Sequence, residues 1–168
     1  RLGLTFVGTY LDKLSTDTGL AGSYDCVGLY GNVCGTPTPE WRHQARLSFD
    51  LPSGFGASVR WRYFDSVTLD ALETNPNLSN TAAAGPAPGG VARPGLAKFD
   101  SVSYFDLTLS AKIGDHYDFR LGANNILDKT PPTTGSQACP AGPCNGNVFA
   151  QTYDALGRYL YAGVKLEF

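Results

Sequence analysis

The chain has 168 residues, with 13 Lys and Arg against 15 Asp and Glu and a formal net charge of −2. This near balance gives no reason to expect nucleic acid as a partner. The mean hydropathy is −0.15, and no uncharged apolar run approaches the roughly 18 residues of a spanning helix, which excludes a helical membrane protein. A membrane β-barrel remains compatible with this composition, because barrel strands alternate and never form a long apolar run.

Six segments alternate apolar and polar residues with a period of two, as amphipathic β-strands do. They cover residues 1–14, 40–51, 55–69, 99–113, 117–126 and 158–168. The first segment starts at Arg1 with no initiator Met and no signal-peptide pattern. We therefore predict an all-β, antiparallel fold and expect the chain to be a segment of a longer protein.

The connections between these strands alternate in length. Long connections at about 15–39, 70–98 and 127–157 take turns with short ones at 52–54 and 114–116. Long loops at one end and tight turns at the other are typical of outer-membrane barrels, with the long loops outside the cell and the turns in the periplasm. We expect the long loops to lack regular structure, and residues 74–96, which are small, polar and rich in Pro and Gly, to be flexible or disordered.

The four cysteines form two close pairs, Cys26/Cys34 and Cys139/Cys144, each in a stretch rich in Gly, Pro and Asn. Local pairing would close each loop on itself and fits an oxidising exterior, although the other two pairings remain open. A zinc site is the alternative interpretation. It is disfavoured because neither His43 nor His116 lies in either loop.

The polar face of the predicted strands is strongly charged, and either a polar barrel lumen or bulk solvent could accommodate it. Its charged residues are Arg42, Arg46, Arg60, Arg62, Lys112, Asp118, Arg120, Lys165 and Glu167. The short turn at 52–54 would place Arg46 opposite Arg60, and like charges that face each other need an anionic partner. That partner is an anionic cargo, or simply Asp50 and Asp106 with water. Lys112 and Asp118 should face each other across the second turn as a register-setting pair.

Geometry indicates that six strands are not the whole barrel. At about 4.8 Å between strands and a tilt of about 40°, six strands give a circumference of only ~37 Å, about 12 Å across. Such a barrel cannot enclose this many long charged side chains, and an open sheet edge cannot face lipid. We therefore expect further strands as partners.

The last 50 residues contain two motifs and a terminal strand that resemble one family. Residues 122–129 read GANNILDK, residues 153–164 read YDALGRYLYAGV, and the chain ends on Phe168 with Leu166, Val164 and Leu160 at alternate positions before it. This order and spacing are similar to the C-terminal part of TonB-dependent outer-membrane receptors. In that family, a terminal strand of this kind is the signal that the barrel-assembly machinery recognises.

The resemblance implies a 22-stranded barrel in the outer membrane of a Gram-negative bacterium, with a plug domain that is absent from this chain. It also implies uptake of a large scarce nutrient, by default a ferric siderophore, powered by the TonB complex through an N-terminal segment that is likewise absent. Outer-membrane lipid is a further expected partner. The resemblance also implies that the charged face lines the lumen and contacts the plug, whose acidic residues would be another anionic partner for Arg46 and Arg60. The chain would then supply the last six strands.

Contacts with the nutrient are expected in the long loops, and aromatic residues near the strand ends are expected to form two girdles at the lipid headgroups. The candidate cargo-contacting residues are Tyr24, Asp25, Tyr30, Gln151 and Tyr153. The outward-facing girdle candidates are Trp41, Trp61, Tyr63, Tyr117 and Phe119. No nucleophile elbow, phosphate loop or metal-ligand spacing is present, so we expect no enzymatic activity and no cofactor. Two other functions remain open: a smaller passive porin or structural barrel, and a secreted, disulfide-stapled β-sandwich that binds a partner.

Overall fold

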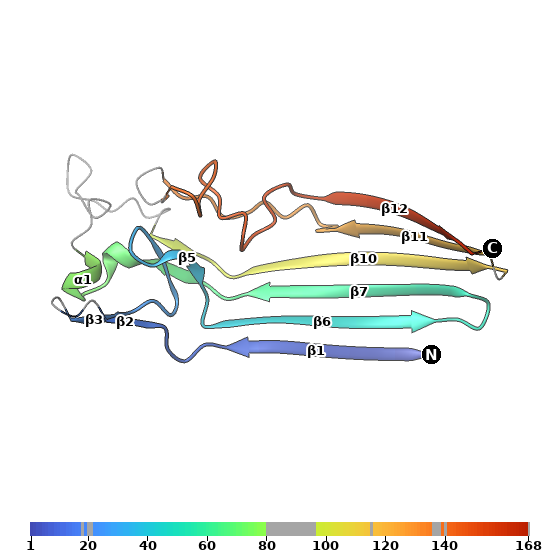
Figure 1. The fold of residues 1–168 in the computed structure, drawn as a ribbon, viewed down its shortest axis with the longest axis horizontal. Coiled ribbons are helices and arrows are strands. Elements are labelled where there is room, and N and C mark those ends of the chain that lie inside the picture. Colours follow the sequence, from blue (N-terminus) through green and yellow to red (C-terminus); the bar gives the residue numbers. More distant parts are fainter. Residues whose placement is uncertain are drawn as a thin grey trace.

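A computed structural model describes residues 1–17, 19, 22–79, 97–114, 116–135, 139 and 141–167. Its main feature is a six-stranded antiparallel sheet whose strands are neighbours in chain order (Figure 1). These strands are β1 (Leu2–Tyr10), β6 (Trp41–Asp50), β7 (Phe55–Phe64), β10 (Val102–Ile113), β11 (Tyr117–Asn124) and β12 (Tyr159–Leu166). The all-β antiparallel prediction is confirmed for this sheet, and each predicted segment contains one of its strands.

The two short connections make tight turns at the same end of the sheet, where β1 starts and β12 ends (Figure 1). In the first turn the N–H of Gly54 donates to the carbonyl of Leu51 at 3.1 Å, and the N–H of Leu51 donates to the carbonyl of Phe55 at 2.8 Å. Gly54 has φ +87° and Gly114 has φ +61°, a region that glycine enters without steric cost. The glycines therefore allow both reversals, although Asp115 in the second turn lies outside the described residues.

Two predicted strand boundaries are wrong. The segment predicted at 55–69 is not one strand: β7 ends at Phe64, and Val67–Leu69 forms β8 in a different sheet. The segment predicted at 99–113 is likewise divided between β9 (Lys98–Phe99) and β10. Val67 and Leu69 keep the odd-numbered positions of the apolar residues of β7, interrupted only by Asp65, so the pattern gives little sign that the backbone leaves one sheet for another there.

The long connections contain regular structure, contrary to the expectation of irregular loops. β4 (Leu29–Gly31), β5 (Gly35–Thr38), β8 and β9 form a four-stranded sheet in the order β5-β4-β8-β9, in which only the β4–β8 pair is parallel. β2 (Ser15–Asp17) and β3 (Ser23–Asp25) form a hairpin, and a 3₁₀-helix, η1 (Asp70–Leu72), precedes α1 (Pro76–Ser79). Most of the segment predicted to be flexible, residues 80–96, lies outside the described residues.

The buried core lies among the loops and not on the sheet. Tyr30 from the first long connection stacks on Phe99 at 4.2 Å between ring centroids, and Phe149 and Tyr153 from the third connection pack on the same pair. The side chains of Tyr30 and Phe149 are fully buried. The three long connections therefore meet in one aromatic core, called here the loop core (Tyr30, Phe99, Phe149, Tyr153).

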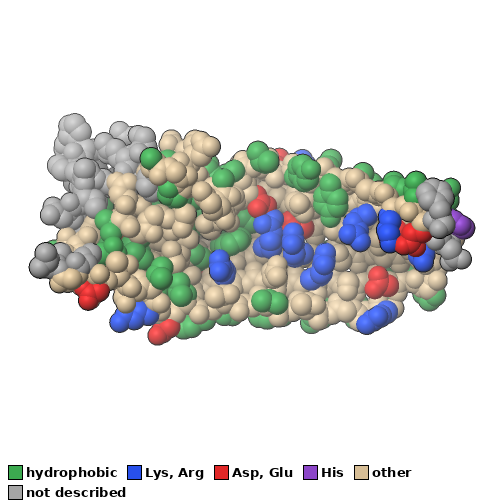
Figure 2. Space-filling model, viewed as in Figure 1, with side chains coloured by type: hydrophobic (Ala, Val, Ile, Leu, Met, Phe, Trp, Pro, Cys, Tyr) green, Lys and Arg blue, Asp and Glu red, His purple; other side chains and the backbone are tan. Residues whose placement is uncertain are grey.

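The sheet has two faces of different character. One face, the apolar face, carries side chains such as Leu4 and Leu160, which are 75% and 70% exposed. The other, the charged face, carries the Lys and Arg side chains that Figure 2 shows gathered along the sheet, with Asp and Glu among them. No helix among the described residues is long and apolar enough to cross a membrane.

Candidate functional site

The candidate site is a network of charged side chains around Asp106, on the charged face near its loop end. Asp106 lies in β10, is only 4% exposed, and pairs in register with Arg60 of β7. Its Oδ2 accepts hydrogen bonds from Arg60 Nε at 2.8 Å and from Arg62 Nε at 2.9 Å. Its Oδ1 accepts from Arg62 Nη2 at 3.0 Å and from the backbone N–H of Asn125 at 2.8 Å. One buried carboxylate therefore joins β7, β10 and the residue after β11.

Arg62 connects this network to the loop before β12. Its Nη1 donates to Oδ1 of Asp154 at 2.9 Å while its Nη2 contacts Oδ2, a bidentate geometry that fixes both planar groups. The guanidinium carbon lies 5.1 Å from the ring centroid of Tyr104, within the range of a cation–π contact. The Tyr104 hydroxyl accepts the backbone N–H of Asp154 at 3.3 Å. Arg62 is 19% exposed, so water screens these interactions only partly.

The first family-like motif, residues 122–129, forms a compact turn on this network. Asn125 is fully buried and adopts φ +50°, a left-handed conformation that asparagine tolerates better than most residues. Its side-chain amide donates to the carbonyl of Lys129 and accepts the N–H of Lys129, each at 2.9 Å. The asparagine therefore closes the turn with its side chain while its backbone N–H binds Asp106.

The second family-like motif, residues 153–164, bonds directly to the first. The backbone N–H of Arg158 donates to Oδ1 of Asp128 at 2.8 Å, and the Arg158 guanidinium lies 3.8 Å from the other carboxylate oxygen. Gly157 has φ +69°, and a Cβ on it would lie 2.9 Å from the Asp128 carboxylate. The two motifs therefore interlock at the loop end of the last hairpin.

Gly122 and Tyr161 form a second contact across the charged face. They are register partners, and a Cβ built on Gly122 would lie 2.1 Å from the Tyr161 ring, so the ring lies directly on the glycine backbone. The Tyr161 hydroxyl reaches Thr108 Oγ1 at 2.8 Å, one strand further. The absence of a side chain at position 122 thus lets β12 hydrogen-bond to β10 over β11.

The other charged residues predicted to line a lumen share the charged face but stay outside the network. Arg46 pairs in register with Arg60, as predicted from the turn. Lys112 and Asp118 also pair in register, without an ion pair, and Lys165 instead contacts Glu167. Among the described residues, Arg42, Arg46, Lys112 and Arg120 make no ion pair. That these residues face a lumen or a plug stays a prediction.

The residues expected to contact cargo fall into two groups. Tyr30 and Tyr153 are 0% and 2% exposed in the loop core, so the expectation that their side chains meet a cargo is corrected. Burial raises the pKa of both phenols. Tyr24, Asp25 and Gln151 keep exposed surface, and contact of these three with a cargo stays a prediction.

Asp25 has a structural role in the first loop. Its Oδ1 accepts the backbone N–H groups of Leu14 at 3.0 Å and Val27 at 3.1 Å. These bonds, the one from Leu14 first, lower the pKa of the carboxyl below its ordinary value. Hydrogen bonds to the ionised form thus tie the start of the loop to its first cysteine.

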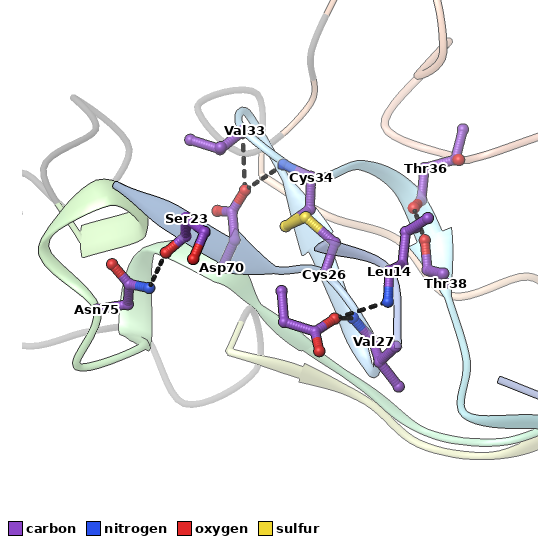
Figure 3. Close-up of a disulfide and its surroundings, with 11 residues drawn as sticks. Leu14, Ser23, Cys26, Val27, Val33, Cys34, Thr36, Thr38, Asp70 and Asn75 are labelled. Atoms are coloured by element: carbon purple, nitrogen blue, oxygen red, sulfur yellow. Dashed lines mark hydrogen bonds between the residues drawn. A yellow bond between two sulfur atoms is a disulfide. The ribbon is translucent and has the colours of Figure 1, made fainter. Parts of the chain in front are cut away.

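Both predicted disulfides, Cys26–Cys34 and Cys139–Cys144, are present. Figure 3 shows the first one beside Asp70, whose Oδ2 accepts the backbone N–H groups of Val33 at 2.8 Å and Cys34 at 2.9 Å. Asp70 is fully buried. The sequence gives no local signal for this contact, because it joins residues of two different loops.

The proposed assembly signal is only partly placed. Leu160, Val164 and Leu166 lie on the apolar face of β12, in register with Ala123, Phe119 and Tyr117 of β11. Phe168 lies outside the described residues.

The network provides ion pairs and a fixed geometry between strands and loops. Within the described ranges, no group of three or more His, Cys, Asp and Glu side chains could hold a metal ion. No protein-family model, curated protein or solved structure matches the chain.

Proposed function

We propose that this chain forms the last six strands of a transmembrane β-barrel in a Gram-negative outer membrane, and that the complete protein is a TonB-dependent receptor. The observation that carries the first part is the apolar face. From Tyr10 in β1 to Leu166 in β12, the described strand residues on that face include no Asp, Glu, Lys or Arg. A soluble monomer rarely exposes so large an apolar surface, whereas lipid covers it.

The apolar face is also banded in the way that a bilayer requires. Leu4, Leu47, Val59, Leu107, Ala123 and Leu160 follow one another in register across all six strands. Aromatic residues lie on both sides of this aliphatic row: Tyr10, Trp41, Trp61, Tyr63 and Phe105 toward the loops, and Phe55, Tyr117 and Phe119 toward the turns. Aromatic girdles on both sides of an aliphatic band are typical of outer-membrane barrels.

Strand length supports the same proposal. β7 has ten residues, which at about 3.4 Å each and a tilt of about 40° span about 26 Å along the membrane normal. The apolar band of outer-membrane barrels is about 25 Å tall. β7 and β6, which also has ten residues, are thus long enough to cross such a band and little longer.

The free edges of the sheet argue for a larger barrel. β1 and β12 each pair with one neighbour, so each leaves a row of N–H and C=O groups that lipid cannot satisfy. We propose that further strands of the same protein pair with both edges. The unpaired Arg42 and Arg46 on the charged face fit a plug that brings acidic side chains into the lumen.

The proposal of a receptor function is supported by the two motifs, residues 122–129 and 153–164, which resemble the receptor family and contact each other at the loop end of the sheet. In this proposal the loops meet the nutrient, by default a ferric siderophore, and the TonB complex acts on the absent N-terminal part. The barrel-assembly machinery would recognise the C-terminal segment of the chain, which contains β12 and Phe168.

Two measurements test the proposal. The first is fractionation and intact mass of the native protein that carries this chain. We expect it in the outer membrane, extractable only with detergent, at well above the ~66 kDa that 22 strands of about 28 residues require. A soluble monomer of 17.9 kDa would contradict the barrel and favour the β-sandwich.

The second measurement is uptake of a panel of ⁵⁵Fe-loaded siderophores by cells with and without the gene. We expect gene-dependent uptake of at least one compound that stops when an uncoupler collapses the proton gradient or when TonB is deleted. Gene-dependent entry of small solutes that neither treatment affects would instead support the passive porin.

A further inference from the structure

One histidine lies within the aromatic cluster at the loop end of the apolar face. The His43 ring stacks on Tyr63 at 5.1 Å between centroids, meets Trp61 edge to face at 4.5 Å, and lies 5.2 Å from Phe6. On its remaining side, Trp41 Nε1 is 2.9 Å from His43 Nδ1. Four aromatic rings from β1, β6 and β7 therefore surround one imidazole.

The hydrogen bond from Trp41 fixes the protonation state of the histidine. The indole Nε1–H can only donate, so His43 Nδ1 must accept with its lone pair. The imidazole in this geometry is therefore neutral, with its hydrogen on Nε2, which has no hydrogen-bond partner. A proton added at Nδ1 would place two N–H donors 2.9 Å apart, and the hydrogen bond would be lost.

Trp41 is the side chain that is free to move when this happens. A Cβ on Gly8 would lie 2.5 Å from the Trp41 ring, so the indole lies directly on the backbone of β1 at a position that has no side chain. His43 also contacts three other rings, those of Phe6, Trp61 and Tyr63, which hold it in place.

The other titratable groups on this side have their own partners. The Tyr63 hydroxyl donates to Asp65 at 3.3 Å, and Glu40, just before β6, interacts with Tyr10 at the end of β1. Phe6 and Gly8 of β1 and Phe105 of β10 bring no charge, while Arg42 lies on the opposite face.

From this geometry we infer that His43 is a pH-sensitive latch for Trp41. The neutral imidazole holds the indole against Gly8, and a proton bound at Nδ1 removes the acceptor and releases it. Trp41 begins β6 directly after the first long loop, so the latch couples the anchoring of that loop to pH. The inference requires the six-stranded sheet and not the transport role.

The test uses the complete protein labelled with 5-fluorotryptophan and observed by ¹⁹F NMR. The Trp41 resonance is identified by its loss in Trp41→Phe. We expect this resonance to move between pH 8 and pH 5 in the unsubstituted protein and in His116→Asn, which removes the other histidine of the chain. It should not move in His43→Gln, whose carbonyl accepts the indole N–H at every pH. A shift that survives His43→Gln overturns the inference.

A second measurement needs no substitution at His43. A water-soluble gadolinium chelate should broaden the Trp41 resonance more at pH 5 than at pH 8, because the released indole leaves Gly8. Equal position and equal broadening at both values overturn the latch even if His43→Gln does not fold. Failure of siderophore uptake alone would contradict the proposed receptor and leave the latch standing.

Discussion

Replacement of Asp106 by Ala should destabilise the protein far more than removal of another carboxylate from the same face. The substitution leaves Arg60, Arg62 and the buried N–H of Asn125 without their shared acceptor. A hydrogen bond to a charged group contributes roughly 1.5–3 kcal/mol, but Arg60 is 37% exposed and regains water, and Arg62 keeps Asp154. We therefore expect a loss of about 3 kcal/mol in the free energy of unfolding, within the range for breaking a buried pair.

Urea unfolding of the complete protein in detergent micelles, followed by tryptophan fluorescence, measures this loss. Asp50→Ala is the matched control, because Asp50 is exposed on the charged face and makes no ion pair, and should cost less than about 0.5 kcal/mol. Asp106→Asn should fall between the two, since its amide oxygen still accepts the Asn125 N–H. A double-mutant cycle with Arg62→Met should give a coupling of at least about 1 kcal/mol. Equal effects of Asp106→Ala and Asp50→Ala, or a coupling near zero, would refute the network as the support of this end of the sheet.

Three further predictions concern the sheet and the first loop. Gly122→Ala should destabilise by about 1–3 kcal/mol in the same urea assay because its Cβ enters the tyrosine ring above it, whereas Gly163→Ala, with open space around it, should cost under about 1 kcal/mol. Asp25 has a lowered pKa, so its contribution to the stability of the folded state is present above the ordinary value near 3.8 and disappears as the pH falls through the lowered pKa. Asp25→Asn should therefore reduce the loss of stability seen in thermal melts recorded between pH 5 and 2. A pH profile identical to that of the unsubstituted protein would contradict this assignment. Opening the Cys26–Cys34 disulfide, whose cysteines are eight residues apart, should lower the stability of the first loop by about 2–3 kcal/mol. We expect the double variant with both cysteines replaced by serine to be cleaved faster by protease in this loop. A cleavage rate equal to that of the unsubstituted protein would argue against this prediction.

The sheet was predictable from the sequence because its determinants are local. Alternation of side chains identifies each strand, and a three-residue connection at 52–54 fixes the register that places Arg46 opposite Arg60. The disulfide pairs were predictable for the same reason, since each closes a short segment. Even here the pattern failed at Val67–Leu69, where alternation continues while the strand changes sheets.

The site and the loop core were not predictable, because they depend on contacts between distant segments. Arg62 and Asp154 are 92 residues apart, and no pattern in the sequence around either residue indicates that they form an ion pair. Tyr153 was a candidate for cargo contact because it lies in a long loop, yet it is buried against Phe64 and Phe99 from other segments. A single sequence shows that a loop contains aromatic residues and does not show which other loop covers them.

The motifs at residues 122–129 and 153–164 can determine the stability of the sheet, and their position indicates that they do not select a cargo. The backbone of Asn125 binds Asp106, and the carboxylate of Asp154 binds Arg62. The carboxylate of Asp128 binds the backbone of Arg158. These motif residues therefore make their contacts within the chain. They hold β7, β10, β11 and β12 together at their loop ends, so they support the six-stranded sheet whichever nutrient a receptor would take up. If the protein is a receptor, the choice of cargo must therefore reside in exposed loop residues such as Tyr24 and Gln151, where the sequence resembles no motif. Substitutions at those positions should change which siderophore is taken up while leaving urea stability unchanged, and substitutions at Asn125 should do the reverse.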